Sequence, residues 1–248
     1  MYAVIGGSGL SKLPGFQLER RQVFRTPYGE PSGALMFGHL ADEEVVFLAR
    51  HGYGHTIAPH QINYRANMSA LSQIADLDGI LSVASVGGIR PDLLPGQLLI
   101  PDQILDYTSG RPSTFFEGSA QVEHIDFTWP YDQTLRSGLR AAADAINESV
   151  VFGGCYACTQ GPRLETAAEV KRLARDGADI VGMTGMPEAA LARELNIPYA
   201  HLALVVNSAA GVGSSAQEIS HAQIAQVVAA GMSRVMGVVK SMIQLHRD

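Results

Sequence analysis

The sequence predicts an α/β protein that forms a single domain over residues 1–248, with a mixed, largely parallel central sheet flanked by helices. Two observations carry this prediction. Apolar, β-favouring segments alternate along the chain with segments whose apolar residues recur at steps of three and four. The 248 residues are also 46% hydrophobic and 17% charged, which is typical of one globular domain of this size.

The expected strands are short apolar runs, several of which end in glycine or in hydroxyl residues. They cover residues 1–5, 44–52, 79–89, 96–107, 150–162, 178–184 and 199–207. The expected helices are amphipathic and cover residues 62–77, 165–177, 187–196 and the chain from about 221 onward. Residues 108–130 lack periodicity and predict a long irregular excursion, of the kind often found at functional sites or subunit contacts.

The charge balance excludes several classes of partner. A formal net charge of −6 argues against non-specific binding to nucleic acid or to an anionic membrane. We find no basic segment followed by an apolar one, as in a secretory signal, and no run of about 18 apolar residues without polar interruption. These features predict a cytoplasmic protein that neither spans a membrane nor binds nucleic acid.

Two cysteines, Cys155 and Cys158, form a CxxC pair. One such pair without a second pair of cysteines or histidines is a weak signal for a redox or metal site. The pair falls on an expected strand, where positions three apart point to opposite faces. The sequence therefore favours two ordinary buried thiols.

Hydrogen-bond donors gather where the expected strands end. The first strand ends in the run Gly6–Gly9, which contains Ser8, and later strands lead into Arg50, Thr184 and Asn207. In an open α/β sheet, ligands bind beyond the carboxyl ends of the strands, and glycine lets backbone amides approach an anion closely. Because the guanidinium of Arg50 adds a planar fork suited to an oxyanion, the sequence predicts a site for one small tetrahedral anion.

The glycine run itself allows other ligands. A dinucleotide site would require a third glycine, but Gly7–Gly9 is followed by Leu10, Ser11 and Lys12, and no clear acidic residue follows about twenty positions on. The triphosphate-binding motif is absent. A plain strand-to-helix turn without a ligand remains the alternative, so the run supports an anion site only together with the other strand ends.

Five longer segments together resemble the trimeric purine nucleoside phosphorylase family, and most of all its methylthioadenosine and methylthioinosine phosphorylase branch. They read IGGSGL, FLARHGYGHTIAPHQINYRAN, GPRLETAAE, GADIVGMTGMPEAALARELNIPYA and LALVVNSAAG. The likeness runs from Met1 to the last helix. It implies a homotrimeric enzyme that cleaves the N-glycosidic bond of a purine nucleoside, with inorganic phosphate as co-substrate and without a metal or organic cofactor.

The resemblance also implies a phosphate subsite. The residues that match the family's phosphate-binding positions are Ser8, Arg50, His51 and Thr184. One departure concerns Ser85, because methylthioadenosine-directed members carry a Thr-Ala pair where Ala84 and Ser85 stand here. Either the Ser85 hydroxyl binds phosphate from a shifted position, or only backbone amides do.

The nucleoside subsite follows from the same resemblance. The implied residues are Leu164, Glu165, Met183 (against the ribose), Asn207, Ser208 and Ala209. Glu165 and Asn207 match the residues of enzymes that act on 6-oxopurines, whereas adenine-directed enzymes carry Asp at the second position. A carboxylate accepts the purine N1–H and an amide donates at N7, so Asn207 is the expected catalytic residue. The alternative for Glu165 is an acidic residue that merely favours a helix N-terminus.

The expected substrate is S-methyl-5′-thioinosine, which would yield hypoxanthine and 5-methylthioribose 1-phosphate. The alternatives are a general enzyme for inosine and guanosine, or one for methylthioadenosine. His221 favours the first alternative, because ordinary purine nucleoside phosphorylases place a histidine at the 5′-hydroxyl there, although it could equally be a surface residue. His124 resembles a residue that closes the pocket of the neighbouring subunit. His55 and His60 are expected to structure their loop.

A different class of function also stays open, namely a hydrolase that uses water instead of phosphate, or a binding protein without activity. The full set of implied phosphate residues counts against both, because water requires no such set of donors.

Overall fold

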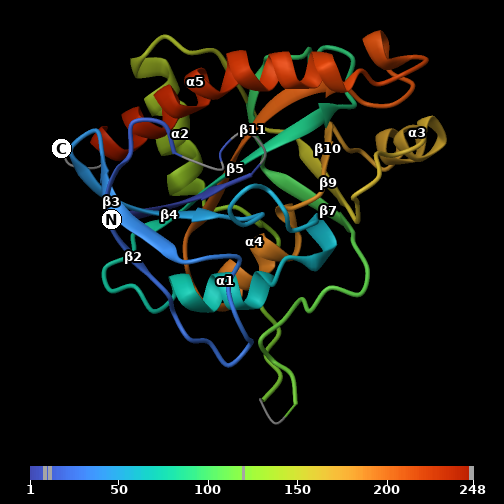
Figure 1. Ribbon diagram of the computed structural model, residues 1–248. Coiled ribbons are helices and arrows are strands. Elements are labelled where there is room, and N and C mark those ends of the chain that lie inside the picture. The colour runs from blue at the N-terminus through green and yellow to red at the C-terminus, as the bar shows by residue number, and fades with distance from the viewer. Residues whose placement is uncertain (8–9, 11–12, 119–120, 246–248) are drawn as a thin grey trace.

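A mixed sheet of eleven strands runs through the centre of the molecule, in a computed structural model that describes residues 1–7, 10, 13–118 and 121–245 (Figure 1). Six of the ten strand pairings are parallel and four are antiparallel, which confirms the predicted mixed, largely parallel sheet. The strands are β1 (Tyr2–Gly6), β2 (Gln17–Gln22), β3 (Leu35–Leu40), β4 (Glu43–Ala49), β5 (Gly79–Gly88), β6 (Leu98–Ile100), β7 (Gln103–Tyr107), β8 (Val150–Phe152), β9 (Cys155–Thr159), β10 (Ile180–Gly182) and β11 (Tyr199–Ser208).

Four parallel strands form the centre of this sheet. Strand β1 lies between β4 and β5, and β11 pairs with the other edge of β5. Gly6 pairs with Ala49, and β5 and β11 continue together beyond these residues to Gly88 and Ser208. The C-terminal halves of β5 and β11 therefore extend past the carboxyl ends of β1 and β4. This brings the ends of the strands together, as expected where they share a ligand.

Strand β10 reverses the direction of the sheet beside β5. Val181 pairs with Gly87 in antiparallel register, while β10 runs parallel to β9 on its other side. The chain after Gly182 is thereby carried back along β5 toward Ser85. This antiparallel pairing brings Met183 and Thr184 to the same cavity as the ends of the parallel strands.

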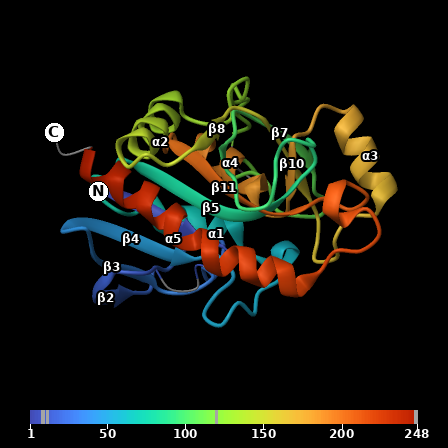
Figure 2. The same cartoon turned by 90° about the horizontal axis from the view of Figure 1, so that it is seen from above.

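Helices cover both faces of the central sheet (Figures 1 and 2). The helices are α1 (Tyr64–Leu71), α2 (Gln133–Ala145), α3 (Ala167–Arg175), α4 (Gly185–Glu194) and α5 (His221–Leu245). Leu139 of α2 and Val239 of α5 belong to one apolar core with Val4 of β1, whereas α1 and α4 pack with Ile5 on the opposite face. This alternation along β1 produces a three-layer domain.

Helix α5 is long and apolar enough to cross a membrane by length and composition alone, and among the described residues it is the one helix of that kind. Its C-terminal half nevertheless packs into the core, where Val235, Val239 and Met242 are buried. A core helix of a globular protein passes the same test, so one such helix is weak evidence for a membrane segment.

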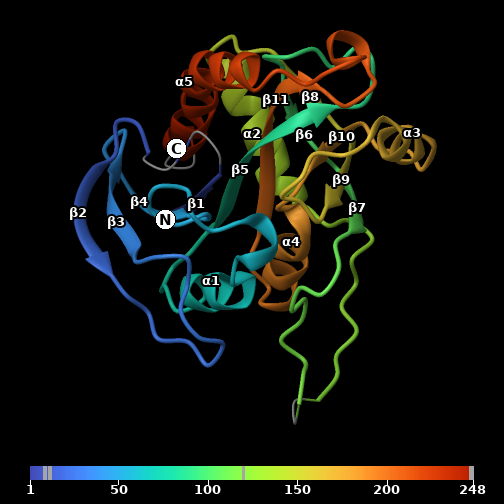
Figure 3. The same cartoon turned by 45° about the vertical axis from the view of Figure 1, so that its right-hand side comes forward.

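Three features differ from the expected elements or extend them. The sequence did not reveal the β2–β3 hairpin or α2, and the expected strand 150–162 is two strands separated at Gly153 and Gly154, which adopt positive φ angles. Residues 108–130 contain no helix or strand where the structure describes them, and they extend away from the body of the domain (Figure 3). Cys158 is buried as predicted, whereas Cys155 is only partly buried.

Candidate active site

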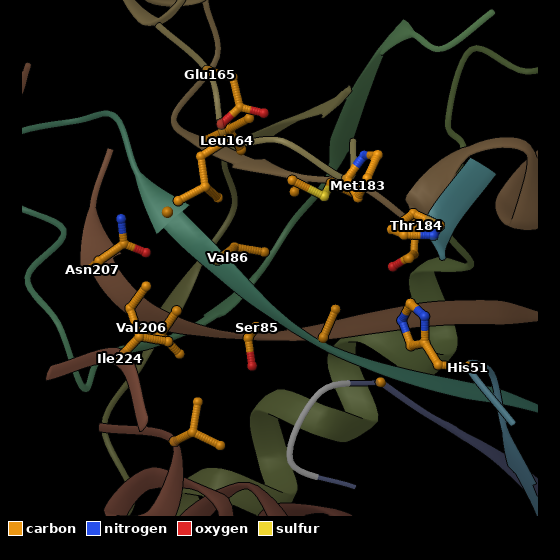
Figure 4. A pocket seen from close by; sticks show the side chains of 18 of the residues that line it. His51, Ser85, Val86, Leu164, Glu165, Met183, Thr184, Val206, Asn207 and Ile224 are labelled. Atoms are coloured by element: carbon orange, nitrogen blue, oxygen red, sulfur yellow. The ribbon is translucent and has the colours of Figure 1, made fainter. Parts of the chain in front are cut away.

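A cavity of about 440 Å³ lies along the C-terminal halves of β5 and β11, and it is closed by the loops that follow β4, β9 and β10. This volume is typical of a site for a small molecule, and the position beyond the strand ends is the one expected for an α/β sheet. Residues predicted from the sequence that line it are His51, Ser85, Leu164, Glu165, Met183, Thr184, Asn207 and Ala209. In Figure 4, Glu165 and Asn207 lie toward one side of the cavity, and His51 and Thr184 toward the other.

Two residues predicted to bind the anion, His51 and Thr184, lie on one side of the cavity. Gly7 lines it too, and a Cβ at this position would lie only 2.9 Å from Arg50 Nη1 and 3.0 Å from the Val83 carbonyl oxygen, so the approach of the backbone requires glycine. The Thr184 amide donates to the Tyr156 hydroxyl (3.3 Å), which fixes the backbone there. Ser8, the remaining hydroxyl predicted for this subsite, lies outside the described residues.

His51 presents a neutral imidazole to this cavity. Its Nδ1 lies 2.8 Å from the Ile57 carbonyl oxygen, and because a carbonyl only accepts, Nδ1 carries the proton. Burial and the nearby Arg50 guanidinium lower the pKa of His51 to about 4. At neutral pH, Nε2 is therefore an acceptor, suited to a P–OH or a sugar hydroxyl.

Glu165 stands on the opposite side with one carboxylate oxygen already held. The Thr159 hydroxyl donates to Oε1 at 2.6 Å. Helix α3 begins only after Thr166, whose hydroxyl accepts from the Glu169 amide while the Glu169 carboxylate accepts from the Thr166 amide. Glu169, not Glu165, is therefore the acid of this capping box, and a charge at Glu165 beside the helix N-terminus stays an alternative to a ligand role.

Asn207 reaches the cavity because β11 is irregular at this point. The register against β5 shifts between Val205 and Asn207, and both Val206 and Asn207 line the cavity although neighbours in a regular strand point to opposite faces. Such a bulge re-aims a side chain next to a functional site. The Asn207 Nδ2 donates one hydrogen to the Ser208 carbonyl oxygen (2.6 Å), which orients the amide and leaves its second hydrogen for a ligand.

The remaining wall of the cavity is apolar. It is formed by Ile219, Ile224 and Val228, at the start of α5 and just before it. Met183 lines the cavity between the two polar sides (Figure 4), and its thioether packs so closely on Gly161 that any side chain there would collide with it. The cavity thus joins an anion side, a polar side with an acceptor and a donor, and an apolar wall.

Comparison with known proteins identifies the family of this chain. Residues 1–244 match the model of the phosphorylase superfamily. The chain belongs to this superfamily. A relative in Pseudomonas syringae pv. tomato, described as a probable S-methyl-5′-thioinosine phosphorylase, is 53% identical over 95% of both chains. The 6-oxopurine nucleoside phosphorylase of Pyrococcus furiosus is 43% identical, over 91% of this chain and 85% of its own.

Solved structures of this superfamily share the fold. A methylthioadenosine phosphorylase from Schistosoma mansoni in complex with adenine superposes with a TM-score of 0.91, at 29% identity, over 98% of this chain and 91% of its own. A methylthioadenosine phosphorylase from an antarctic soil metagenomic library gives a TM-score of 0.89 at 36% identity, with 98% and 85% covered. The agreement over the whole chain confirms the predicted fold class.

Arg50 of this phosphorylase differs from the prediction. It is fully buried, and its fork is occupied by Glu188: Nε donates to Oε2 at 2.6 Å and Nη2 to Oε1 at 2.7 Å. The prediction that the paired N–H groups of the guanidinium bind the anion is therefore wrong, because Glu188 occupies them. The remaining nitrogen, Nη1, donates to the Val83 carbonyl oxygen (3.1 Å) and lies next to the backbone at Gly7.

Two predicted nucleoside residues do not line the cavity. His221 is exposed at the first residue of α5, and the wall that it was expected to join is formed by Ile219, Ile224 and Val228. Ser208 is buried with its hydroxyl 3.2 Å from that of Ser214. Its neighbour Asn207 takes the cavity-facing place as a result of the bulge.

The other histidines divide between the cavity and the surface. His55 lines the cavity, where its ring lies 4.2 Å from that of His51, and the structural role expected for it in its loop stays a prediction. His60 lies on an exposed 3₁₀ turn. His124 is exposed on the 108–130 excursion, outside the cavity of its own chain, and its role toward a neighbouring subunit stays a prediction.

Proposed function

We propose that this phosphorylase cleaves the N-glycosidic bond of S-methyl-5′-thioinosine with inorganic phosphate, giving hypoxanthine and 5-methylthioribose 1-phosphate. The observation that carries the proposal is the combination, in one cavity, of Glu165 and Asn207 on one side with the apolar wall of Ile219, Ile224 and Val228. The first pair fits a 6-oxopurine and the wall fits a methylthio group.

The base preference follows from hydrogen-bonding complementarity. A 6-oxopurine carries a proton at N1, which the free oxygen of Glu165 accepts, and an acceptor at N7, to which the Asn207 amide donates. Adenine has an unprotonated N1 that would face the carboxylate without a proton between them. Such an unpaired buried group costs about 1–3 kcal/mol, which favours hypoxanthine or guanine over adenine.

The apolar wall argues for the methylthio substituent over a 5′-hydroxyl. A hydroxyl buried against Ile219, Ile224 and Val228 would lose its hydrogen bonds to water without a partner, whereas a methylthio group buries apolar surface. The exposed place of His221 supports the same choice, because no side chain of the described wall donates to a 5′-hydroxyl from that position.

The reaction requires electrostatic stabilisation more than acid–base catalysis. Positive charge develops on the ribosyl group, where the phosphate dianion stabilises it and then attacks, and negative charge develops on the purine, where Asn207 donates to N7. Holding phosphate and sugar together supplies much of the rate enhancement.

We propose that no metal or organic cofactor takes part. We also propose that the enzyme works in the cytoplasm as a homotrimer in which His124 approaches the cavity of a neighbouring subunit.

Release of free base from S-methyl-5′-thioinosine, inosine and methylthioadenosine, each with and without phosphate, tests the proposal. We expect cleavage that requires phosphate and is fastest on S-methyl-5′-thioinosine. Faster cleavage of inosine would make this a general purine nucleoside phosphorylase and return a role to His221. A preference for methylthioadenosine would contradict the assignment of Glu165 and Asn207, and cleavage without phosphate would indicate a hydrolase.

A further inference from the structure

A buried ion pair lies directly behind the anion side of the cavity. Glu188 in α4 and Arg50 after β4 are 1% and 0% exposed, and two hydrogen bonds of 2.6 and 2.7 Å join the carboxylate to the guanidinium. Glu188 does not line the cavity. Arg50 does not line it either, but its Nη1 lies against the backbone at Gly7, which does, so we consider how Glu188 acts on the cavity through Arg50.

Two further residues fix the carboxylate in place. Glu188 Oε1 also accepts from the Ser82 hydroxyl (2.9 Å) and from the Tyr199 hydroxyl (2.8 Å), and Ser82 Oγ in turn accepts from Arg50 Nη2 (2.7 Å). The carboxylate thus receives four hydrogen bonds. These bonds and the positive charge of Arg50 lower the pKa of Glu188 against the effect of burial, so that it is ionised.

This arrangement decides which N–H group of Arg50 lies toward Gly7, the residue that lines the cavity where Arg50 itself does not. A guanidinium has five N–H groups, and four of them donate to Glu188, Ser82 and the Val83 carbonyl oxygen. The fifth is on Nη1, the atom that lies nearest to a Cβ placed on Gly7. Rotation of the guanidinium would break the bonds to Glu188, so the carboxylate holds Nη1 toward the strand end where the phosphate is proposed to bind.

The pair also sets the charge of the subsite. The negative charge of Glu188 compensates that of Arg50 at contact distance, and His51 is neutral. Among the described residues lining the anion side, none contributes an uncompensated positive charge. The phosphate is then held by directed hydrogen bonds, whose strength depends on the exact placement of each donor.

We propose that Glu188 is a positioning residue of the phosphate subsite: through its paired hydrogen bonds it fixes the Arg50 guanidinium so that Nη1 donates to bound phosphate. This proposal rests on the phosphate-dependent reaction proposed above. It separates Glu188 from the residues that bind the nucleoside, because its hydrogen bonds lead to Arg50 and to the neighbouring strands β5 and β11.

The test uses Glu188→Gln, which keeps the shape but turns an amide N–H toward Arg50 Nε or Nη2, and Glu188→Asp, which keeps the charge but withdraws it. In both variants we expect the KM for phosphate to rise about tenfold or more, as for a lost hydrogen bond to a charged group, while the nucleoside KM stays within about twofold. The rise in melting temperature produced by inorganic phosphate should shrink in parallel, which gives a readout independent of turnover.

Two further variants keep the test decisive. Ser82→Ala preserves the ion pair but removes the hydroxyl that joins its two members, so we expect a smaller rise in phosphate KM than in the Glu188 variants. This variant carries the test if the Glu188 variants fail to fold. Glu44→Gln, on the exposed surface of β4, is the matched control and should change neither KM.

Equal rises in both KM values with a lowered melting temperature, or an unchanged phosphate KM in a folded variant, would overturn the positioning role. A wild-type enzyme that shows neither phosphate-dependent cleavage nor stabilisation by phosphate would instead overturn the proposed function.

Discussion

The hydrogen bond from Thr159 to Glu165 provides a direct test of how this enzyme selects its base. The hydroxyl has one proton and two acceptors within reach, Glu165 Oε1 at 2.6 Å and the Gly182 carbonyl oxygen at 3.3 Å. The shorter distance and the charge of the carboxylate assign the proton to Glu165. Thr159→Val retains the β-branched shape and removes this donor, so the carboxylate loses the bond that orients its free oxygen toward the purine N1.

The magnitude follows from the nature of this bond. A hydrogen bond to a charged group contributes about 1.5–3 kcal/mol, which corresponds to roughly a ten- to 150-fold change in an equilibrium or rate ratio. We expect kcat/KM for S-methyl-5′-thioinosine to fall by this range in Thr159→Val. For methylthioadenosine the loss should be smaller, because its N1 has no proton for Glu165 to accept, and the ratio of the two values should fall.

Steady-state release of hypoxanthine and of adenine measures this ratio directly. Thr134→Val, an exposed residue in the first turn of α2, is the matched control and should leave both values unchanged. If Thr159→Val lowered kcat/KM equally for both nucleosides, or raised the phosphate KM instead, the assignment of Thr159 to base selection would be refuted.

Three other predictions concern the base, the 5′ group and acid stability. Asn207→Asp should shift the kcat/KM ratio toward 6-aminopurine nucleosides, because a carboxylate accepts from a 6-amino group; loss of turnover on both bases alike would show that Asn207 is catalytic without selecting the base. Ile224→Ser should lower kcat/KM for S-methyl-5′-thioinosine about tenfold, as for the loss of about 1.5 kcal/mol of apolar burial, with a smaller effect on inosine; equal losses would contradict the methylthio wall. The free energy of unfolding, measured by urea denaturation, should fall as the pH is lowered from 7 to 5. Burial lowers the pKa of His51 to about 4 and that of His201 to about 3, so below about pH 6.5 the unfolded chain takes up protons that the folded chain does not. Each group then lowers the free energy of unfolding by up to about 1.4 kcal/mol per pH unit. A free energy of unfolding that does not change with pH would contradict this.

Much of the architecture could be predicted because its signals are local. The apolar runs of β1, β5 and β11 are nearly unbroken, as in strands buried on both faces, and the structure places all three in the centre of the sheet. Helix α2 was not predicted, although it carries a local signal, since Asp132 caps it and Leu135 and Leu139 are four residues apart. Strand β2, by contrast, is largely exposed and carries no apolar alternation, so only its pairing with β3 defines it.

The site could be predicted by residue type but not in its contacts. The strand-end positions of Thr184 and Asn207 are visible in the sequence, the family resemblance implied Glu165, and all three line one cavity. The partner of Arg50 is not visible, because Glu188 lies 138 residues away and a lone acid in a helix is usually solvated. The two alternatives for His221 stayed open for a similar reason: where α5 begins relative to the cavity decides between His221 and Ile219, and no local pattern fixes that offset.

The charges around the cavity fit the reaction proposed for it. A phosphate dianion bound to an uncompensated cation would be strongly stabilised in the ground state. Because such stabilisation would not increase in the transition state, it would not lower the activation barrier. Glu188 compensates Arg50, and the low pKa of His51 keeps its ring neutral, so both residues reduce that ground-state attraction. The charge of the bound phosphate then remains available to the ribosyl cation as it forms, which is where electrostatic stabilisation accelerates bond cleavage.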